Sequence, residues 1–291
     1  EIVDAVRMRF DVPLVAHMMD DWPSTIYRGG LLSPLENRRM QTTLRRLLRV
    51  ASGRMAIGDT MARAYQKRYG MPFMAFQNPV ELDQAILASR DRAPEGPARL
   101  VYSGSVFADA QSESLIEVAQ AVAKLADGGR SIALDLYVPA FQIEQFLNRL
   151  KIHPAISVHP PLTNDAEFFA TLGAASVLAL PVNFDAHSVA FIRYSMPTKV
   201  PAYLFSGTPI LVYGPDQVAQ VDYAKTDGWG YVVPKRGVAH LTKAIERLLD
   251  DQLLRQKLVV TARRVAKKNH SASEVRPRFQ AALAAAASTR E

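Results

Sequence analysis

The chain has 291 residues, of which 48% are hydrophobic and 22% are charged, so it can form cores for two domains and is not disordered throughout. It contains no cysteine, which excludes disulfides, cysteine-ligated zinc and cysteine nucleophiles. The net charge of +7 favours an anionic partner, such as a nucleotide, a nucleic acid or a membrane surface. We recognise no secretory signal and no apolar run of the roughly 20 residues that span a bilayer, so we expect a cytoplasmic protein.

The first 96 residues predict an α/β domain that is incomplete. The chain opens with Glu1 in what reads as the middle of a fold, so we expect upstream residues to be missing. The first strand contains His17 and ends in a polar run, in which we assign Asp20 and Asp21 to a turn. The expected strands lie at 13–18, 54–58 and 72–77, and the expected helices at 34–51 and 61–69.

Helix 34–51 has an apolar stripe on one side and arginines on the other. Arg38, Arg45 and Arg49 share one face of it. Such a face is ordinarily solvated, and its functional interpretation is contact with anionic lipid headgroups, to which each cation contributes about 1 kcal/mol. Peripheral contact with the inner membrane face is therefore one hypothesis. Nucleic acid is not an expected partner, because the cations lack interleaved aromatic residues.

After a polar linker at 87–97, strands and helices alternate. This pattern predicts a parallel sheet with both faces covered, in a second Rossmann-like domain at 97–268. A last helix, within 269–291, is expected to return to the first domain. The expected strands lie at 100–103, 132–138, 156–159, 176–181, 210–213 and 230–233, and the expected helices at 112–126, 141–150, 165–172, 197–206, 217–225, 238–249 and 252–268.

Several familiar catalytic motifs are absent. The six histidines are scattered, and no HExxH frame occurs, so we expect no metal site. The chain also lacks the G-x-S-x-G elbow, the P-loop and the G-x-G-x-x-G fingerprint. A simple hydrolase, a P-loop enzyme and a Rossmann dehydrogenase therefore lose their main support.

The stretch at 195–215 predicts a phosphate site. Pro197 suits the first turn of a helix, and Gly207 suits the position just after its end. The free N–H groups of the helix would then face a loop with basic and hydroxyl side chains. The candidate phosphate ligands are Arg193 and Ser195, in the loop before the helix, and Lys199, one turn into it.

Gly104 and Ser105 follow the strand at 100–103 directly. A residue without a Cβ at this point allows the backbone to approach a phosphate closely. The alternative interpretation is a turn that ends the strand.

Four segments in this order resemble a retaining glycosyltransferase with the GT-B fold, most similar to glycosyltransferase family 4. The segments are His17 with the run at 20–23, the strand exit at 102–105, Leu-Ala-Leu-Pro at 178–181, and the block at 197–210. The resemblance implies a pair of Rossmann-like domains with parallel sheets, of which the N-terminal domain lacks its beginning.

The resemblance also implies a function. The C-terminal domain would hold a nucleotide diphosphate sugar, and the N-terminal domain a saccharide or lipid-linked acceptor, with transfer under retention and without cofactor or metal. Gly104 and Ser105 would face the diphosphate, and Arg193, Ser195, Thr198 and Lys199 would position it. His17 would lie near the reacting carbon of the sugar, and Asp185 is a candidate sugar contact.

Two positions depart from that family. It typically carries two glutamates, the second of which holds the ribose, where this chain has Tyr194 and Ala202. The chain could therefore also be a catalytically silent relative that acts as a binding or assembly subunit. A third alternative is a peripheral membrane protein whose basic helix is its main function.

Overall fold

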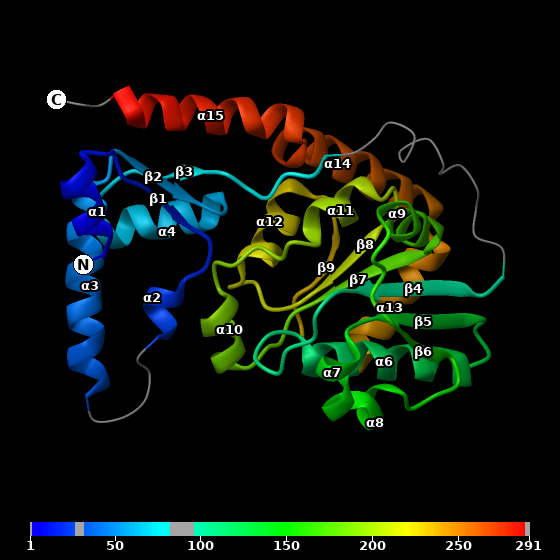
Figure 1. Ribbon diagram of the computed structural model, residues 1–291. Helices are drawn as coiled ribbons and strands as arrows, with labels where there is room; N and C mark the ends of the chain where they lie inside the picture. Colours follow the sequence, from blue (N-terminus) through cyan, green and yellow to red (C-terminus); the bar gives the residue numbers. More distant parts are fainter. Residues whose placement is uncertain (1, 27–31, 82–95, 289–291) are drawn as a thin grey trace.

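The computed structural model describes residues 2–26, 32–81 and 96–288, and it contains two separate parallel sheets (Figure 1). This confirms the predicted α/β class with parallel sheets. Most of the linker expected at 87–97 lies outside the described residues.

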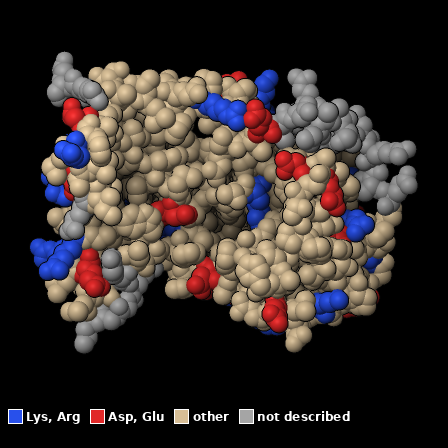
Figure 2. All heavy atoms as spheres, in the orientation of Figure 1, with Lys and Arg blue, Asp and Glu red and all other residues tan. Residues whose placement is uncertain are grey.

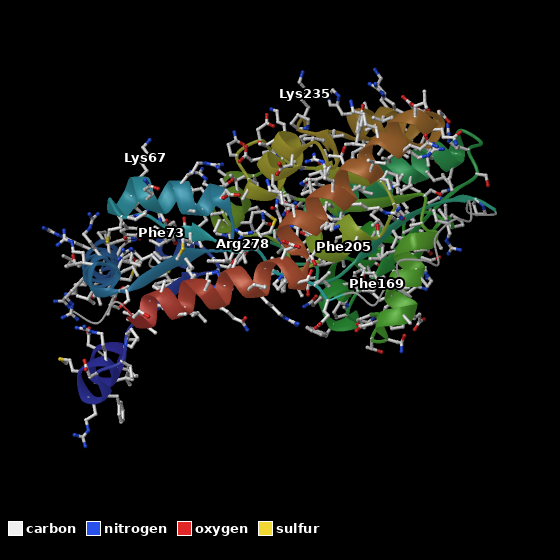
Figure 3. All side chains as sticks on the ribbon, turned by 90° about the horizontal axis from the view of Figure 1, so that it is seen from above. Lys67, Phe73, Phe169, Phe205, Lys235 and Arg278 are labelled. Carbon is white, nitrogen blue, oxygen red and sulfur yellow. The ribbon has the colours of Figure 1, made fainter. Side chains whose placement is uncertain are left out.

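The N-terminal sheet has three strands in the order β1-β2-β3, namely Val15–Met18, Gly53–Ala56 and Met74–Ala75. Its residues alternate between two helical layers. Met55 of β2 clusters with Val275 and Ala282 of α15 (Ala272–Ser288), whereas its neighbour Ala56 clusters with Met61 of α4 (Asp59–Tyr69). Figure 3 shows α4 and α15 on opposite sides of this sheet. Three further helices belong to this half: α1 Ile2–Phe10, α2 Trp22–Thr25 and α3 Ser33–Val50.

The C-terminal sheet has six strands in the order β6-β5-β4-β7-β8-β9. In chain order this is the 3-2-1-4-5-6 arrangement of Rossmann-like folds, and the strand order reverses between β4 and β7. Ligands of such sheets bind in the crevice beyond the carboxyl ends of the strands at that point. The strands are β4 Ala98–Ser103, β5 Ile132–Tyr137, β6 Ile156–His159, β7 Val177–Pro181, β8 Ile210–Tyr213 and β9 Tyr231–Val233.

Helices cover both faces of this sheet. One face is packed by α6 (Ser112–Asp127) and α13 (Val238–Asp250), whose apolar residues share a core with Leu100 and Leu134. The other face carries the second core, which includes Tyr203 and Trp229. This core continues into the N-terminal half through α3 and α4, and the C-terminal helices that contribute to it are α9 Asp165–Ala174, α10 Ala186–Ile192, α11 Val200–Phe205, α12 Ala219–Asp227 and α14 Gln252–His270.

Some predicted elements differ from the structure. The helix expected at 141–150 is three short pieces, α7 Ala140–Ile143, the 3₁₀ turn η1 Glu144–Phe146 and α8 Leu147–Leu150. The short helices α1, α2 and α10 were not predicted, because four to nine residues offer too little periodicity to recognise.

The helix expected at 197–206 begins at Val200, not at Pro197. Pro201, not Pro197, occupies its first turn, and Lys199 is the residue just before the helix instead of one turn within it. Its end is as predicted, because Gly207 adopts a φ of 74° there.

Hydrogen bonds and a β-bridge connect the N-terminal and C-terminal halves of the molecule. Asn78 accepts a hydrogen bond at its carbonyl from the buried His270, at 3.0 Å, and Val80 pairs with Ser271 in a parallel bridge. From this junction α15 runs along the N-terminal sheet (Figure 1), and Phe279 lies 5.9 Å from the ring of His17. Thr60 also donates to Asp222 across the interface, at 2.9 Å.

Candidate functional site

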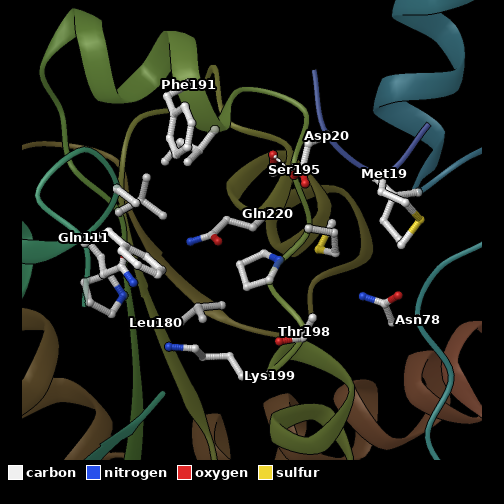
Figure 4. Close-up of a pocket in the computed structure, with 18 of the residues that line it drawn as sticks. Met19, Asp20, Asn78, Gln111, Leu180, Phe191, Ser195, Thr198, Lys199 and Gln220 are labelled. Carbon is white, nitrogen blue, oxygen red and sulfur yellow. Dashed lines mark hydrogen bonds between the residues drawn. The ribbon is translucent and has the colours of Figure 1, made fainter. Parts of the chain in front are cut away.

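A cleft of about 550 Å³ lies between the two sheets, at the point where the C-terminal strand order reverses. Figure 2 shows the hollow between the two halves of the molecule, and Figure 4 shows the side chains of the cleft. The residues that line it include Asp20, Asn78, Tyr102, Gln111, Ser195, Thr198, Lys199 and Gln220.

Lys199 is the cation of this cleft. It is half-buried, and its Nζ lies 3.8 Å from the centre of the Tyr102 ring. The ring face favours the charged ammonium, but burial opposes it and lowers the pKa of Lys199 to about 7. Within the described residues no carboxylate forms an ion pair with it. An anionic ligand would therefore meet a cation that has no protein counter-ion.

Gly104 makes room for that lysine. A Cβ on Gly104 would lie 2.8 Å from Lys199 Nζ, and the residue has a φ of 128°, which side chains rarely adopt. The Gly104 N–H, however, already donates to Tyr137 O at 3.0 Å, as part of the sheet. The glycine thus allows Lys199 to pack closely against the backbone, and its own N–H is not available to a phosphate.

The loop after β4 is held by side chains. Tyr102 Oη and Gln111 Nε2 both donate to the carbonyl of Ser105. Tyr203 of α11 accepts from the Ser103 N–H at 2.9 Å, which fixes the end of β4 beside α11. These bonds set the shape of the loop before any ligand arrives.

A second cavity, of about 560 Å³, lies on the other side of Lys199. Thr198 and Lys199 line both cavities, so the two are neighbours along one wall. Gly104 and Ser105 line the second cavity, together with Ala202, one of the two positions where the resembled family carries a glutamate. Because residue 202 is an alanine, it contributes no carboxylate to this cavity. Asp165 and Phe168 of α9 also line the cavity.

The N-terminal wall of the cleft contains Asp20. Ser195 Oγ donates to Asp20 Oδ1 at 2.6 Å, which links the two halves of the molecule. Its neighbour Asp21 points elsewhere: it is buried and receives hydrogen bonds from Arg68, at 2.7 and 3.1 Å, and from Tyr65, at 2.7 Å. From the sequence we predicted a turn for both aspartates, because two adjacent residues of the same type give no sign that their surroundings differ.

Four predicted residues come together around Lys199, and three do not. Ser195 and Thr198 line the cleft, and Gly104 and Ser105 lie beside Lys199. Among the remaining three, Arg193 is exposed at the end of α10 and lines neither cavity.

Asp185 and His17 have other surroundings. Asp185 caps α10 by accepting from Ser188 N at 2.9 Å. His17 lines a separate cavity of about 390 Å³, between β1 and α15, where burial lowers its pKa. Tyr194, at the other glutamate position, lies 6.0 Å from the guanidinium of Arg68.

No three His, Asp or Glu side chains in residues 2–26, 32–81 and 96–288 are gathered as a metal ion would need. No helix in the described part of the chain combines the length and the apolar content of a membrane span.

No protein-family profile and no curated sequence matches the chain, but many solved structures resemble it. A UDP-forming trehalose-phosphate synthase from Burkholderia xenovorans superposes with a TM-score of 0.69 at 14% identity, over 96% of this chain and 69% of that one. HepE from Anabaena, solved in complex with UDP and glucose, gives 0.68 at 12%, over 97% and 74%. WaaG, a glycosyltransferase involved in lipopolysaccharide biosynthesis, gives 0.62 at 15%, over 96% and 80%.

These neighbours are GT-B glycosyltransferases, and the likeness extends over both sheets of the chain. The chain therefore has the GT-B type of fold, a pair of Rossmann-like units with a cleft between them.

Proposed function

We propose that the chain binds a nucleotide diphosphate sugar in this cleft and transfers the sugar to a saccharide or lipid-linked acceptor. The observation that carries the proposal is Lys199: a cation without a counter-ion, seated against Gly104 at the switch point of the sheet. A diphosphate leaving group develops negative charge as the sugar departs, and a fixed cation in a partly buried site stabilises that charge. Thr198 and Ser195 provide hydroxyl donors on the same wall.

The nucleotide is proposed to be a uridine diphosphate. HepE was solved with UDP and glucose, and the trehalose-phosphate synthases are described as UDP-forming, which supports this choice. If UDP binds, the melting temperature of the chain rises: at 100 times the dissociation constant the gain is about 2.7 kcal/mol, or roughly 5–10 °C. Guanosine diphosphate is the comparison ligand. No shift with either nucleotide contradicts the proposal.

Retention is proposed because the segment at 197–210 resembles a retaining family. The measurement is the anomeric configuration of the product, determined by NMR for whichever UDP sugar is consumed. A product with inverted configuration contradicts retention but leaves the donor site in place. Binding of UDP sugars without any turnover would instead favour a silent binding subunit.

We propose further that α3 contacts an anionic membrane surface. Arg38 and Arg49 are exposed, and Leu35 on the same helix is 60% exposed. Arg45 is also exposed, but it donates to Arg68 O at 3.2 Å and lies 5.7 Å from the Tyr69 ring, so it has a structural partner. Arg39 lines a groove of about 370 Å³ with Trp22 and Leu44 beside these cations.

The double variant Arg38→Gln/Arg49→Gln tests this contact. Two cations at about 1 kcal/mol each predict roughly 30-fold weaker binding to vesicles that contain 30% phosphatidylglycerol, measured by co-sedimentation at low salt. The charge-matched control is Lys235→Gln/Lys257→Gln, on exposed positions of the C-terminal unit. Equal loss in both variants would show a net-charge effect and no role for α3.

A further inference from the structure

The cleft contains polar groups besides the proposed diphosphate ligands. Among the described residues that line the cleft, Asp20 is the one carboxylate and Lys199 is the one cation. Asp20 comes from the segment after β1, in the N-terminal unit, so the acid and the cation belong to different sheets.

Gln220 of α12 is the second such group. It is 2% exposed, and its Nε2 has no hydrogen-bond partner among the described residues. Figure 4 shows its amide pointing into the pocket, between Lys199 and the pair Ser195 and Asp20. A buried donor without a partner destabilises the empty protein, because it has lost its water without gaining a bond. A ligand oxygen in the cleft would supply the missing acceptor.

Asp20 is held by a hydrogen bond from Ser195, a residue that could instead bind a ligand. Its Oδ1 accepts from Ser195 Oγ at 2.6 Å, and its side chain is otherwise exposed to the cleft. Ser195 is also a candidate donor to the diphosphate. If Ser195 turns to the diphosphate, Asp20 loses its donor and becomes free to accept hydrogen bonds from another group.

We propose that Asp20 and Gln220 form the subsite for the transferred sugar. A sugar hydroxyl is both a donor and an acceptor, so it pairs with a carboxylate that only accepts and an amide that donates. The two groups lie along one cleft with Lys199, as an extended ligand with a diphosphate at one end and a sugar at the other requires. This assignment rests on the proposed donor site and names the residues that recognise the sugar.

The experiment compares UDP with UDP-glucose, UDP-galactose and UDP-N-acetylglucosamine by calorimetry. The quantity measured is the ratio between the dissociation constants of UDP and of each UDP sugar. Asp20→Asn and Gln220→Met are each expected to lower this ratio tenfold or more for the preferred sugar, while the affinity for UDP itself changes less than threefold. The control is Asp216→Asn, a surface carboxylate outside the cleft that pairs with Lys225 at 3.2 Å.

The melting temperature of Gln220→Met gives a second test, because a purely structural role for Gln220 predicts a lower value for the variant. Since the methionine removes a buried unpaired donor, the ligand-free variant is expected to melt roughly 2–4 °C higher than the unmodified chain. A lower melting temperature with an unchanged ratio would show a structural glutamine and overturn its part in the subsite.

The remaining outcomes separate this assignment from the proposed function. An unchanged ratio in Asp20→Asn, with UDP still bound, overturns the assignment and leaves the donor site standing. If the unmodified chain binds neither UDP nor any of the three sugars, the donor site fails and the subsite fails with it.

Discussion

Replacement of Lys199 by methionine is expected to weaken UDP binding by about 10- to 150-fold, the range for a hydrogen bond to a charged group. The end of the lysine side chain lies against Gly104 and over the Tyr102 ring, and methionine places an unbranched apolar side chain there without the charge. Burial already disfavours the lysine charge, so the ligand-free variant should be no less stable than the unmodified chain. Calorimetry with UDP and a melting curve without it measure both quantities.

The same lysine predicts a pH dependence of binding. Its pKa is about 7 in the free protein, and a bound diphosphate raises it because the anion favours the ammonium form. Binding therefore takes up a proton above pH 7, and the affinity falls by up to tenfold per pH unit as the pH rises from 7. This slope should be absent from Lys199→Met.

Lys225→Met is the matched control for this experiment. Lys225 is 62% exposed and pairs with Asp216 on the surface of α12. Its loss is expected to change neither the affinity nor the pH slope. If Lys199→Met binds UDP as the unmodified chain does, or retains the slope, then Lys199 is not the diphosphate ligand.

Replacement of Arg68 by methionine is expected to lower the free energy of unfolding by about 3–5 kcal/mol. Arg68 binds the two carboxylate oxygens of Asp21, at 2.7 and 3.1 Å, and Asp21 is only 2% exposed. Without the guanidinium the carboxylate stays buried with a single donor, Tyr65. Urea denaturation at pH 7 measures the loss.

Two variants make this prediction specific. Arg63→Met removes an arginine from the same helix that is 68% exposed and lies 3.6 Å from Asp222, and its expected effect is below about 1 kcal/mol. The double variant Arg68→Met/Asp21→Asn should recover part of the loss, because it removes the uncompensated charge. Equal effects of Arg63→Met and Arg68→Met would show that burial of Asp21 does not matter.

The sequence determined most of the secondary structure and the class of fold. Alternating apolar segments of strand and helix length specify parallel strands covered by helices, and all nine strands of the described residues overlap predicted ones. The sequence also predicted Gly207 as the residue just after a helix, because the left-handed conformation at that position favours glycine. The start of α11 was placed three residues early, because Pro197 and Pro201 suit a first turn equally well.

Part of the surroundings of Lys199 could be predicted from the sequence. Residues at the carboxyl ends of β4 and β7 meet at one edge of the sheet, and this places Gly104 beside the segment that contains Lys199. The sequence did not predict where each side chain points. Asp20 and Asp21 are adjacent and identical, yet one faces the cleft and the other is buried against Arg68.

The sequence alone therefore determined which elements form and which strand ends meet, because local periodicity and turn chemistry depend on neighbours in the chain. Only the tertiary structure decided which side chains share the cleft. His17 turned toward α15, and Asp185 became a helix cap, whereas Gln220 was enclosed without a partner. Apart from the Asp185 cap, which is a contact with Ser188 close by in the chain, these outcomes depend on contacts between residues far apart in the sequence, such as His17 and Phe279, which local patterns do not encode.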